Sequence, residues 1–186
     1  MLRAATKHGA SVTQTFAEEA MNPMGLLGLN KLMLIHSGEE IAEILRICAN
    51  ASNYPICYHC SSGLILSLPP LASPKTLPVI LLLFSLFPGK DRTGLISALI
   101  LSLCGVSKAD VVANYHLSET LLEAVIPLIE AENEDKGLVG FDGTPSEVME
   151  QTLDFIDSEW GSVPSYLKSI GFEYFEQQML VNNMVH

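Results

Sequence analysis

The sequence predicts an α/β fold in which a parallel sheet is flanked by helices. A short aromatic and β-branched run at 54–58 is typical of a buried strand. One amphipathic segment precedes this run and several follow it, and strands that alternate with helices are typical of α/β domains. Only one convincing strand is visible, and the first 30 residues offer little β pattern. We therefore expect the domain to be truncated at its N-terminal side.

The segment before the strand, SGEEIAEILRICA at 37–49, is predicted to be a helix. Ser37 and Glu40 have the spacing of a capping box, in which each side chain bonds a free backbone N–H of the first turn. Helical spacing then places four apolar residues on one face: Ile41, Ile44, Leu45 and Cys48.

The segment RTGLISALILSLCG at 92–105 is predicted to be a second helix with a wide apolar stripe. The stripe consists of Leu95, Ile96, Leu99, Ile100 and Leu103. Gly105 is expected to end this helix, because glycine readily adopts the left-handed conformation that closes helices. A third helix is predicted at 107–122, where Ser107 and Asp110 have the spacing of an N-terminal cap.

The strongest helix signal is TPSEVMEQTLDFIDSEWG at 144–161. Thr144 is expected to cap this helix, with Pro145 at the first helical position and Glu147 completing a capping box. Gly161 is expected to end it. Two further helices complete the chain, at 163–170 and 172–184.

The length and charge of the chain limit its function. With 186 residues it is about one domain, long enough to bury a hydrophobic core. The formal net charge of −11 argues against nucleic acids or anionic membranes as partners, because those surfaces require clustered Lys and Arg. An anionic ligand must therefore be bound by a local group of residues and not by the surface as a whole. We divide the chain into an irregular segment at 1–28 and a domain at 29–186, which contains an insert at 63–88.

The four cysteines are Cys48, Cys57, Cys60 and Cys104. Cys57 and Cys60 form a C-x-x-C pair, which occurs in metal and redox sites, but no second such pair or spaced histidine pair accompanies it. We therefore expect no metal and no cofactor. Nothing suggests a disulfide framework, so a reducing, cytoplasmic compartment is expected. Redox pairing of Cys57 with Cys60 stays open as an alternative.

Two short motifs lie on either side of the insert. YHCSSG ends at Gly63, and GKDRTG begins at Gly89. Removal of the 26 residues 63–88 joins the motifs into one loop that follows the strand and opens the helix. In the joined loop five residues separate Cys60 from Arg92: Ser61, Ser62, Gly89, Lys90 and Asp91.

The joined loop has the residues that phosphoryl chemistry requires. Backbone N–H groups of a tight loop and the following helix N-terminus attract an anion, and the same field is expected to lower the pKa of the Cys60 thiol. Arg92 can bind two phosphoryl oxygens, Asp91 can protonate a leaving oxygen, and Thr93 can bond the sulfur. The candidate catalytic residues are Cys60, Arg92 and Asp91, and the candidate substrate-binding residues are Ser61, Ser62, Gly89, Lys90, Thr93 and Gly94.

The joined segment resembles the HC-x5-R-[ST] signature of cysteine-based phosphatases, and its GKDRTG ending is similar to the atypical tyrosine phosphatase family of bacteria and fungi. Flanking segments such as GVSKADVVANYHLSE also resemble that family, so the likeness covers about 29–171 apart from the insert. It implies a cysteine-phosphatase-like parallel sheet and a phosphocysteine intermediate. By resemblance Cys60 is the nucleophile, Arg92 binds phosphate, and Lys90 and Asp91 are the residues that distinguish the family. The N-terminal strands of the family, with their NFRD-like segment, are not found in this sequence.

The insert is unusual as protein sequence. Its longest proline-free apolar run has about nine residues, whereas a membrane-spanning helix needs roughly 20, so no transmembrane span is expected. Solvent-facing loops are not built from Leu, Ile and Phe. Leu, Ser, Phe and Pro are encoded largely by pyrimidine-rich codons, as at the end of an intron, and 26 residues correspond to 78 nucleotides. We hypothesise a retained intron or an error in the gene model.

These observations lead to one functional hypothesis and two alternatives. The hypothesis is a protein-tyrosine-phosphatase-like phosphoric monoester hydrolase that acts on a phosphotyrosine protein or a phosphoinositide, with no nucleic-acid partner. Because the loop is split, we expect little or no activity from the chain as written. The alternatives are a catalytically inactive phosphatase-like protein that binds phosphate, and a non-functional product.

Overall fold

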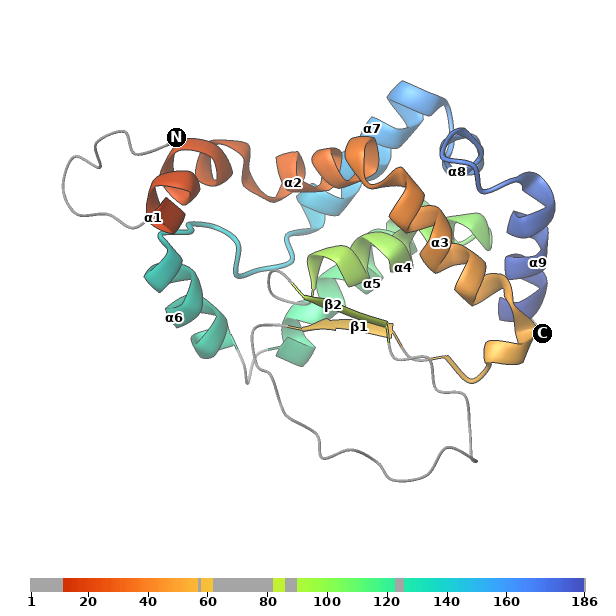
Figure 1. Cartoon of the computed structure of the whole chain (residues 1–186), viewed down its shortest axis with the longest axis horizontal. Helices are drawn as coiled ribbons and strands as arrows, with labels where there is room; N and C mark the ends of the chain where they lie inside the picture. The colour runs from red at the N-terminus through yellow and green to blue at the C-terminus, as the bar shows by residue number, and fades with distance from the viewer. Residues whose placement is uncertain (1–11, 57, 62–81, 86–89, 123–125, 186) are drawn as a thin grey trace.

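The computed structural model describes residues 12–56, 58–61, 82–85, 90–122 and 126–185, and for the strands it describes only the backbone (Figure 1). The first half of this part of the chain contains α1 (Val12–Phe16), the π-helical turn η1 (Ala17–Met21), α2 (Asn22–His36), α3 (Gly38–Ala49), the 3-10 turn η2 (Ala51–Asn53), β1 (Tyr58–Ser61) and β2 (Leu82–Ser85). The second half contains α4 (Asp91–Leu103), α5 (Lys108–Leu122), α6 (Ile126–Lys136), α7 (Ser146–Trp160), α8 (Val163–Ser169) and α9 (Tyr174–Met184).

The predicted α/β fold, a parallel sheet flanked by helices, is wrong. The described residues are predominantly helical, and their strands are two pieces of four residues each. The strands pair in parallel, with Cys60 opposite Phe84, and β2 lies within the insert at 63–88. A layered α/β domain needs several neighbouring strands, whereas here the apolar helix faces pack mainly on one another.

The predicted strand at 54–58 is displaced toward the C-terminus, and β1 begins only at Tyr58. Tyr54 turns back to α3, where its hydroxyl donates a hydrogen bond to the Cys48 carbonyl at 2.7 Å. This carbonyl lies in the last turn of the helix, where backbone acceptors need partners from outside it. Tyr54 therefore helps to complete the end of α3 instead of entering a sheet.

The main core joins α2, α3, α4, α5, α7, α8 and α9. The predicted face of α3 is confirmed, because all four of its apolar residues are buried. The stripe on α4 is also buried, except that Leu103 is only partly covered. Figure 1 shows α1 and α6 at one end of the molecule and α8 and α9 at the other.

Two helix ends follow the predicted glycine signals. Gly105 has φ +82° after α4, and Gly161 has φ +80° after α7. The cap at Ser107 is also confirmed, because its hydroxyl oxygen accepts from the Asp110 backbone N–H at 3.2 Å. These ends depend on residues within a few positions of each other, which is why sequence alone indicates them.

One predicted cap holds in position only, and another is wrong. Ser37 is the N-cap residue of α3, as predicted, but within the described chain its side chain makes no capping bond. Helix α7 begins at Ser146 with Pro145 before it, so Thr144 lies outside the helix. Thr144 is fully buried, and its side chain points to α5 instead of to α7.

The segment at 1–28, expected to be irregular, is helical from Val12 onward, and residues 1–11 lie outside the described part. Helix α2 bends at Gly25, whose φ is +62°. A second small core joins this region to the loop after α6, and it consists of Ala17, Met21, Leu26, Leu138 and Phe141. Among the helices that the structure describes, none combines the length and the apolar character needed to cross a membrane.

The single tryptophan, Trp160, lies at the C-terminal end of α7 between two aromatic rings. Its ring centroid is 4.8 Å from that of Tyr166 and 5.6 Å from that of Phe155, both in edge-to-face geometry. Tyr166 is fully buried, and its hydroxyl donates to the Leu34 carbonyl at 3.0 Å in the last turn of α2. One tyrosine therefore connects α8 to both α7 and α2.

Substitution Tyr166→Phe is expected to lower the free energy of unfolding by about 1 kcal/mol, because it removes one buried hydrogen bond and keeps the ring. The measurement is urea denaturation, in which the slope of the free energy of unfolding against urea concentration should stay the same. Tyr174→Phe is the matched control, since Tyr174 is 53% exposed on α9. Equal effects of the two substitutions would contradict the role given to the Tyr166 hydroxyl.

Candidate functional site

The two halves of the predicted loop lie at β1 and at the start of α4, and these two elements are in contact. Cys60 and Ser61 belong to β1, for which only the backbone is described. Ser62 and Gly89 lie outside the described residues. The structure therefore places the second half of the loop in atomic detail and the first half only by its strand.

Lys90 and Asp91 form a buried charged pair at the N-terminus of α4. Their side chains are 1% and 5% exposed, and the Lys90 Nζ lies 3.4 Å from Asp91 Oδ1. The same ammonium group donates to the Gly143 carbonyl. Tyr115 of α5 is also buried and shares a hydrogen bond with the Asp91 carboxyl. Three segments of the chain thus meet around this buried pair.

Burial raises the pKa of Asp91 to about 6, because the charged carboxylate loses its hydration. Lys90, Arg92 and the hydrogen bond from Tyr115 all act in the opposite direction and lower this pKa. The loss of hydration outweighs their combined effect. Burial and the neighbouring Asp91 together raise the pKa of Tyr115, so its hydroxyl stays protonated and can donate.

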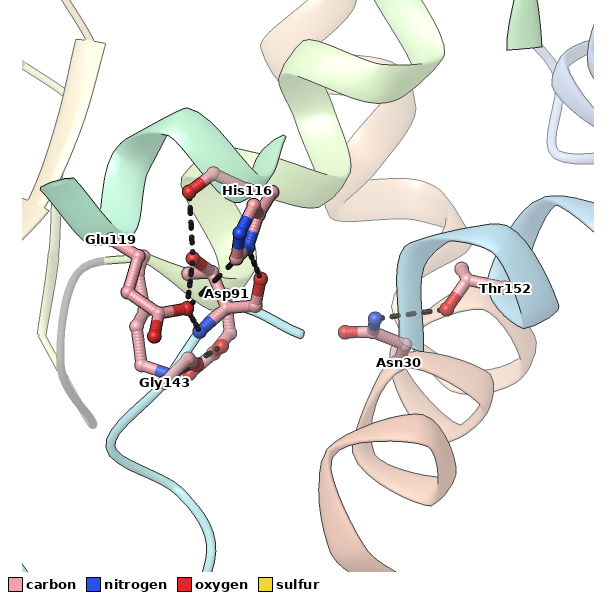
Figure 2. A network of polar contacts seen from close by, with 8 residues as sticks. Asn30, Asp91, His116, Glu119, Gly143 and Thr152 are labelled. Atoms are coloured by element: carbon pink, nitrogen blue, oxygen red, sulfur yellow. Dashed lines mark hydrogen bonds and ion pairs between the residues drawn. The ribbon is translucent and has the colours of Figure 1, made fainter. Parts of the chain in front are cut away.

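Helix α5 holds the segment that accepts the bond from Lys90. The Thr144 backbone N–H and hydroxyl donate to Glu119 Oε2 at 3.1 and 3.3 Å. His116 Nδ1 lies 3.0 Å from the Thr144 carbonyl oxygen. Figure 2 shows His116, Glu119 and Gly143 gathered next to Asp91, while Asn30 and Thr152 form a separate pair between α2 and α7. Lys90 thus binds Gly143 itself, and α5 holds the next residue, Thr144.

His116 and Glu119 were missed by the sequence analysis. They are three residues apart on α5, so both face the same side of the helix. Their partner Thr144 lies 25 residues beyond Glu119, and no local pattern connects them. The sequence signal for these residues was the motif NYHLSE, which lies in a segment that resembles the phosphatase family. The motif does not indicate which residue they contact.

The remaining predicted residues lie in the first turn of α4. Arg92 and Thr93 are partly exposed, and each is already engaged in polar or electrostatic interactions. Gly94 lies against the Tyr115 ring, because a Cβ added there would be 2.7 Å from two ring carbons. The last glycine of GKDRTG thus has a packing reason: it lets α4 approach the tyrosine that bonds Asp91.

Among the described residues, no group of three His, Cys, Asp or Glu side chains could hold a metal ion. Cys48 and Cys104 are free thiols, and burial raises the pKa of both. A raised pKa makes a cysteine a poor nucleophile near neutral pH. The Cys57 and Cys60 side chains lie outside the described atoms, so their proposed redox pairing stays a prediction.

The pKa of Asp91 predicts a pH dependence of stability. The folded state holds a proton on Asp91 up to about pH 6, whereas the unfolded state loses it near 3.8. The stabilisation is complete below the unfolded pKa and is lost as the pH rises through the folded pKa, by up to about 3 kcal/mol. Asp91→Asn should remove this part of the slope in urea unfolding between about pH 4 and about pH 7.

The matched control for Asp91→Asn is Asp154→Asn, which changes an exposed carboxylate on α7 that pairs with Lys108. This variant should keep the slope of the unmodified chain. If Asp91→Asn also keeps that slope, Asp91 does not titrate above its unfolded value and the explanation from burial is wrong.

The contact between Gly94 and Tyr115 predicts a steric cost. Gly94→Ala should lower the free energy of unfolding by about 1–3 kcal/mol, even though alanine favours helices by about 1 kcal/mol. The added methyl group must displace the Tyr115 ring. The measurement is a double-mutant cycle with Tyr115→Ala, in which the Gly94→Ala penalty should largely disappear. An unchanged penalty in the absence of the ring would show that another contact causes it.

The chain is similar in sequence to a known protein and to a protein family. The chain is 35% identical over 111 residues to a protein from Nostoc commune named "Tyrosine-protein phosphatase". The match covers 53% of this chain and 37% of that protein, so the chain spans little more than a third of its relative.

The sequence model of the tyrosine phosphatase family matches residues 71–186. The match begins within the insert and includes Lys90, Asp91 and Arg92, together with every helix from α4 to α9. It thus contains the buried pair at the start of α4, the α5 residues around it and most of the core. The resemblance seen in the sequence is confirmed: the chain belongs to the tyrosine phosphatase family.

Proposed function

We propose that this chain is a tyrosine-phosphatase-like phosphoric monoester hydrolase with Cys60 as its nucleophile. The observation that carries this proposal is the family match, which contains the segment where Lys90, Asp91 and Arg92 open α4. The proposed substrate is a phosphotyrosine protein, with a phosphoinositide as the second choice. A reducing, cytoplasmic location is proposed with it, because the nucleophile must stay a thiolate.

The proposed reaction has two steps. The Cys60 thiolate attacks phosphorus, an S–P bond forms, and the ester P–O bond breaks as Asp91 gives its proton to the leaving oxygen. Water then attacks the phosphocysteine, Asp91 takes a proton from it, and phosphate leaves with the thiolate restored. Arg92 binds two phosphoryl oxygens throughout, while the backbone of Ser61, Ser62, Gly89, Thr93 and Gly94 surrounds the phosphate.

Two observations support the role of Asp91. A pKa of about 6 leaves part of the carboxyl protonated near neutral pH, as a proton donor requires. Its position at the first residue of α4 places it next to Arg92 in the sequence. Lys90 is turned to the Gly143 carbonyl and to Asp91, which supports a role in orienting the acid in addition to the proposed contact with phosphate.

The insert is proposed to prevent activity. An anion-binding loop needs consecutive backbone N–H groups held in one tight turn. In the chain as written, β1 pairs with β2 from the insert, and the insert separates Ser62 from Gly89 in the sequence, so the residues of the loop are not consecutive. We therefore propose that residues 63–88 come from a retained intron and that their removal joins the loop. Sequencing of the transcript across this region tests the origin of the insert.

Three proteins test the catalytic proposal: the chain as written, a variant that lacks residues 63–88, and the same variant with Cys60→Ser. Only the second is expected to hydrolyse para-nitrophenyl phosphate and a phosphotyrosine peptide, with inhibition by vanadate. Cys60→Ser should reduce its rate by about a thousandfold or more, because no other group replaces the nucleophile. Tryptophan fluorescence and thermal melting should show that all three have the same helical core.

Two results would contradict the proposal. Hydrolysis by the chain as written, abolished by Cys60→Ser, would show that the insert is compatible with catalysis. Hydrolysis by the shortened variant that survives Cys60→Ser would exclude the nucleophile. Phosphopeptide binding without turnover by both lengths would favour the alternative of an inactive phosphate-binding protein, and the lack of a cooperative melt would favour a non-functional product.

A further inference from the structure

The ammonium group of Lys90 is shared between two acceptors at the start of α4. It donates to the Gly143 carbonyl, and it lies 3.4 Å from Asp91 Oδ1. A full hydrogen bond between an ammonium group and a carboxylate is about 2.7–2.9 Å long. Asp91 Oδ1 has no hydrogen bond among the described residues, although the side chain is only 5% exposed. The Gly143 carbonyl thus holds the ammonium group away from close contact with the acid.

The Gly143 carbonyl is oriented by the residue that follows it, Thr144. The Gly143 carbonyl and the Thr144 N–H belong to one planar peptide group, so a bond that fixes one end also orients the other. The Thr144 N–H donates to Glu119 Oε2 at 3.1 Å, and the Thr144 hydroxyl donates to the same oxygen at 3.3 Å (Figure 2). One peptide group therefore connects Glu119 on α5 to Lys90 on α4.

Two further bonds hold Thr144 against α5. Its carbonyl oxygen lies 3.0 Å from His116 Nδ1, and because a carbonyl only accepts, this nitrogen is the donor. The Thr144 hydroxyl also lies 3.4 Å from the His116 carbonyl oxygen. Thr144 is fully buried, so its backbone groups need these partners from the protein.

We propose that Glu119 is a positioning residue for Asp91. Through the peptide group of Gly143 and Thr144, it keeps the ammonium group of Lys90 on the carbonyl and away from Asp91 Oδ1. Asp91 then lacks the close cation that would favour its charged form, and it keeps the proton that an acid must donate. This inference rests on the proposed role of Asp91 as the proton donor.

The sign of the expected effect follows from the groups around the acid. Among the described residues, Lys90 and Arg92 of α4 and Tyr115 of α5 all lower the pKa of Asp91, whereas burial raises it. Release of the Gly143 carbonyl lets the ammonium group approach Asp91 Oδ1 and form a full ion pair. The pKa of Asp91 should then fall, which can be measured without any substrate.

The experiment uses the full chain and follows the side-chain carboxyl carbon of Asp91 by 13C NMR over a pH series. The signal is identified by its loss in Asp91→Asn. In the unmodified chain it should titrate at a pH of about 6. In Glu119→Ala the midpoint should fall by about one pH unit or more, because Thr144 loses the acceptor of both donors.

Glu119→Gln is the matched control, since it removes the charge and keeps an oxygen acceptor. Both Thr144 donors reach the same oxygen of Glu119, so one amide oxygen can replace it. The midpoint should therefore stay at about 6. Thr144→Val removes only the hydroxyl bond and should lower the midpoint less than Glu119→Ala. It carries the test if Glu119→Ala shows no cooperative melt.

Three results would overturn the inference. The first is an Asp91 midpoint that stays unchanged in the folded Glu119→Ala variant, or in Thr144→Val if that variant carries the test. The second is an equal fall in Glu119→Gln, since loss of charge alone would then explain it. The third is an Asp91 that titrates near its unfolded value in the unmodified chain. Failure of the shortened variant to hydrolyse phosphate esters would instead contradict the proposed function, so the two failures are distinguishable.

Discussion

The burial of α4 is the constraint on which both the core and the candidate site depend. Leu95 and Leu99 are buried at its centre, and it packs against α2, α5, α8 and β1. A helix enclosed on several sides has one position and one rotation, because every alternative exposes apolar surface or collides with a neighbour. The first residues of α4 are the candidate site residues. The core therefore sets the direction in which Asp91 and Arg92 leave the helix.

The buried pair of Lys90 and Asp91 shows how two opposing effects are balanced. Removing two charges from water costs several kcal/mol per ion, and their attraction compensates only when further hydrogen bonds are made. Lys90 finds the Gly143 carbonyl, and Asp91 finds Tyr115. One oxygen of Asp91 nevertheless has no hydrogen bond among the described residues, which agrees with a pKa raised by burial. The pair is thus held in place but incompletely compensated, and a buried group with such a perturbed pKa is a candidate for a functional site.

The sequence predicts correctly those features that depend on residues close to one another in the chain. The buried faces of α3 and α4 follow from helical spacing, and Gly105 and Gly161 end helices because only glycine adopts their conformation at low cost. Prediction from the sequence failed where a hydrogen-bond partner lies far away in the chain. Thr144 was expected to cap α7, but Glu119 on another helix takes both of its donors.

The same limit applies to the sheet and to the candidate site. The α/β prediction extended one apolar run into a layered sheet that the described chain does not contain. GKDRTG indicated candidate residues for the site, but the acceptor of Lys90 is 53 residues away, beyond the reach of any local pattern. The family match supports the importance of the motif, whereas the roles of Cys60 and Arg92 stay predictions.

The position of Trp160 gives this protein a spectroscopic property of practical use. Helix α7 has 15 residues, and at about 1.5 Å per residue its two ends are roughly 20 Å apart. Thr144 and the candidate site lie near one end, and Trp160 with its aromatic neighbours lies at the other. We therefore expect intrinsic emission to report the assembly of the helical core and to change little when residues around Lys90 are altered. A variant that alters the loop can be judged folded by its emission spectrum before any substrate is added.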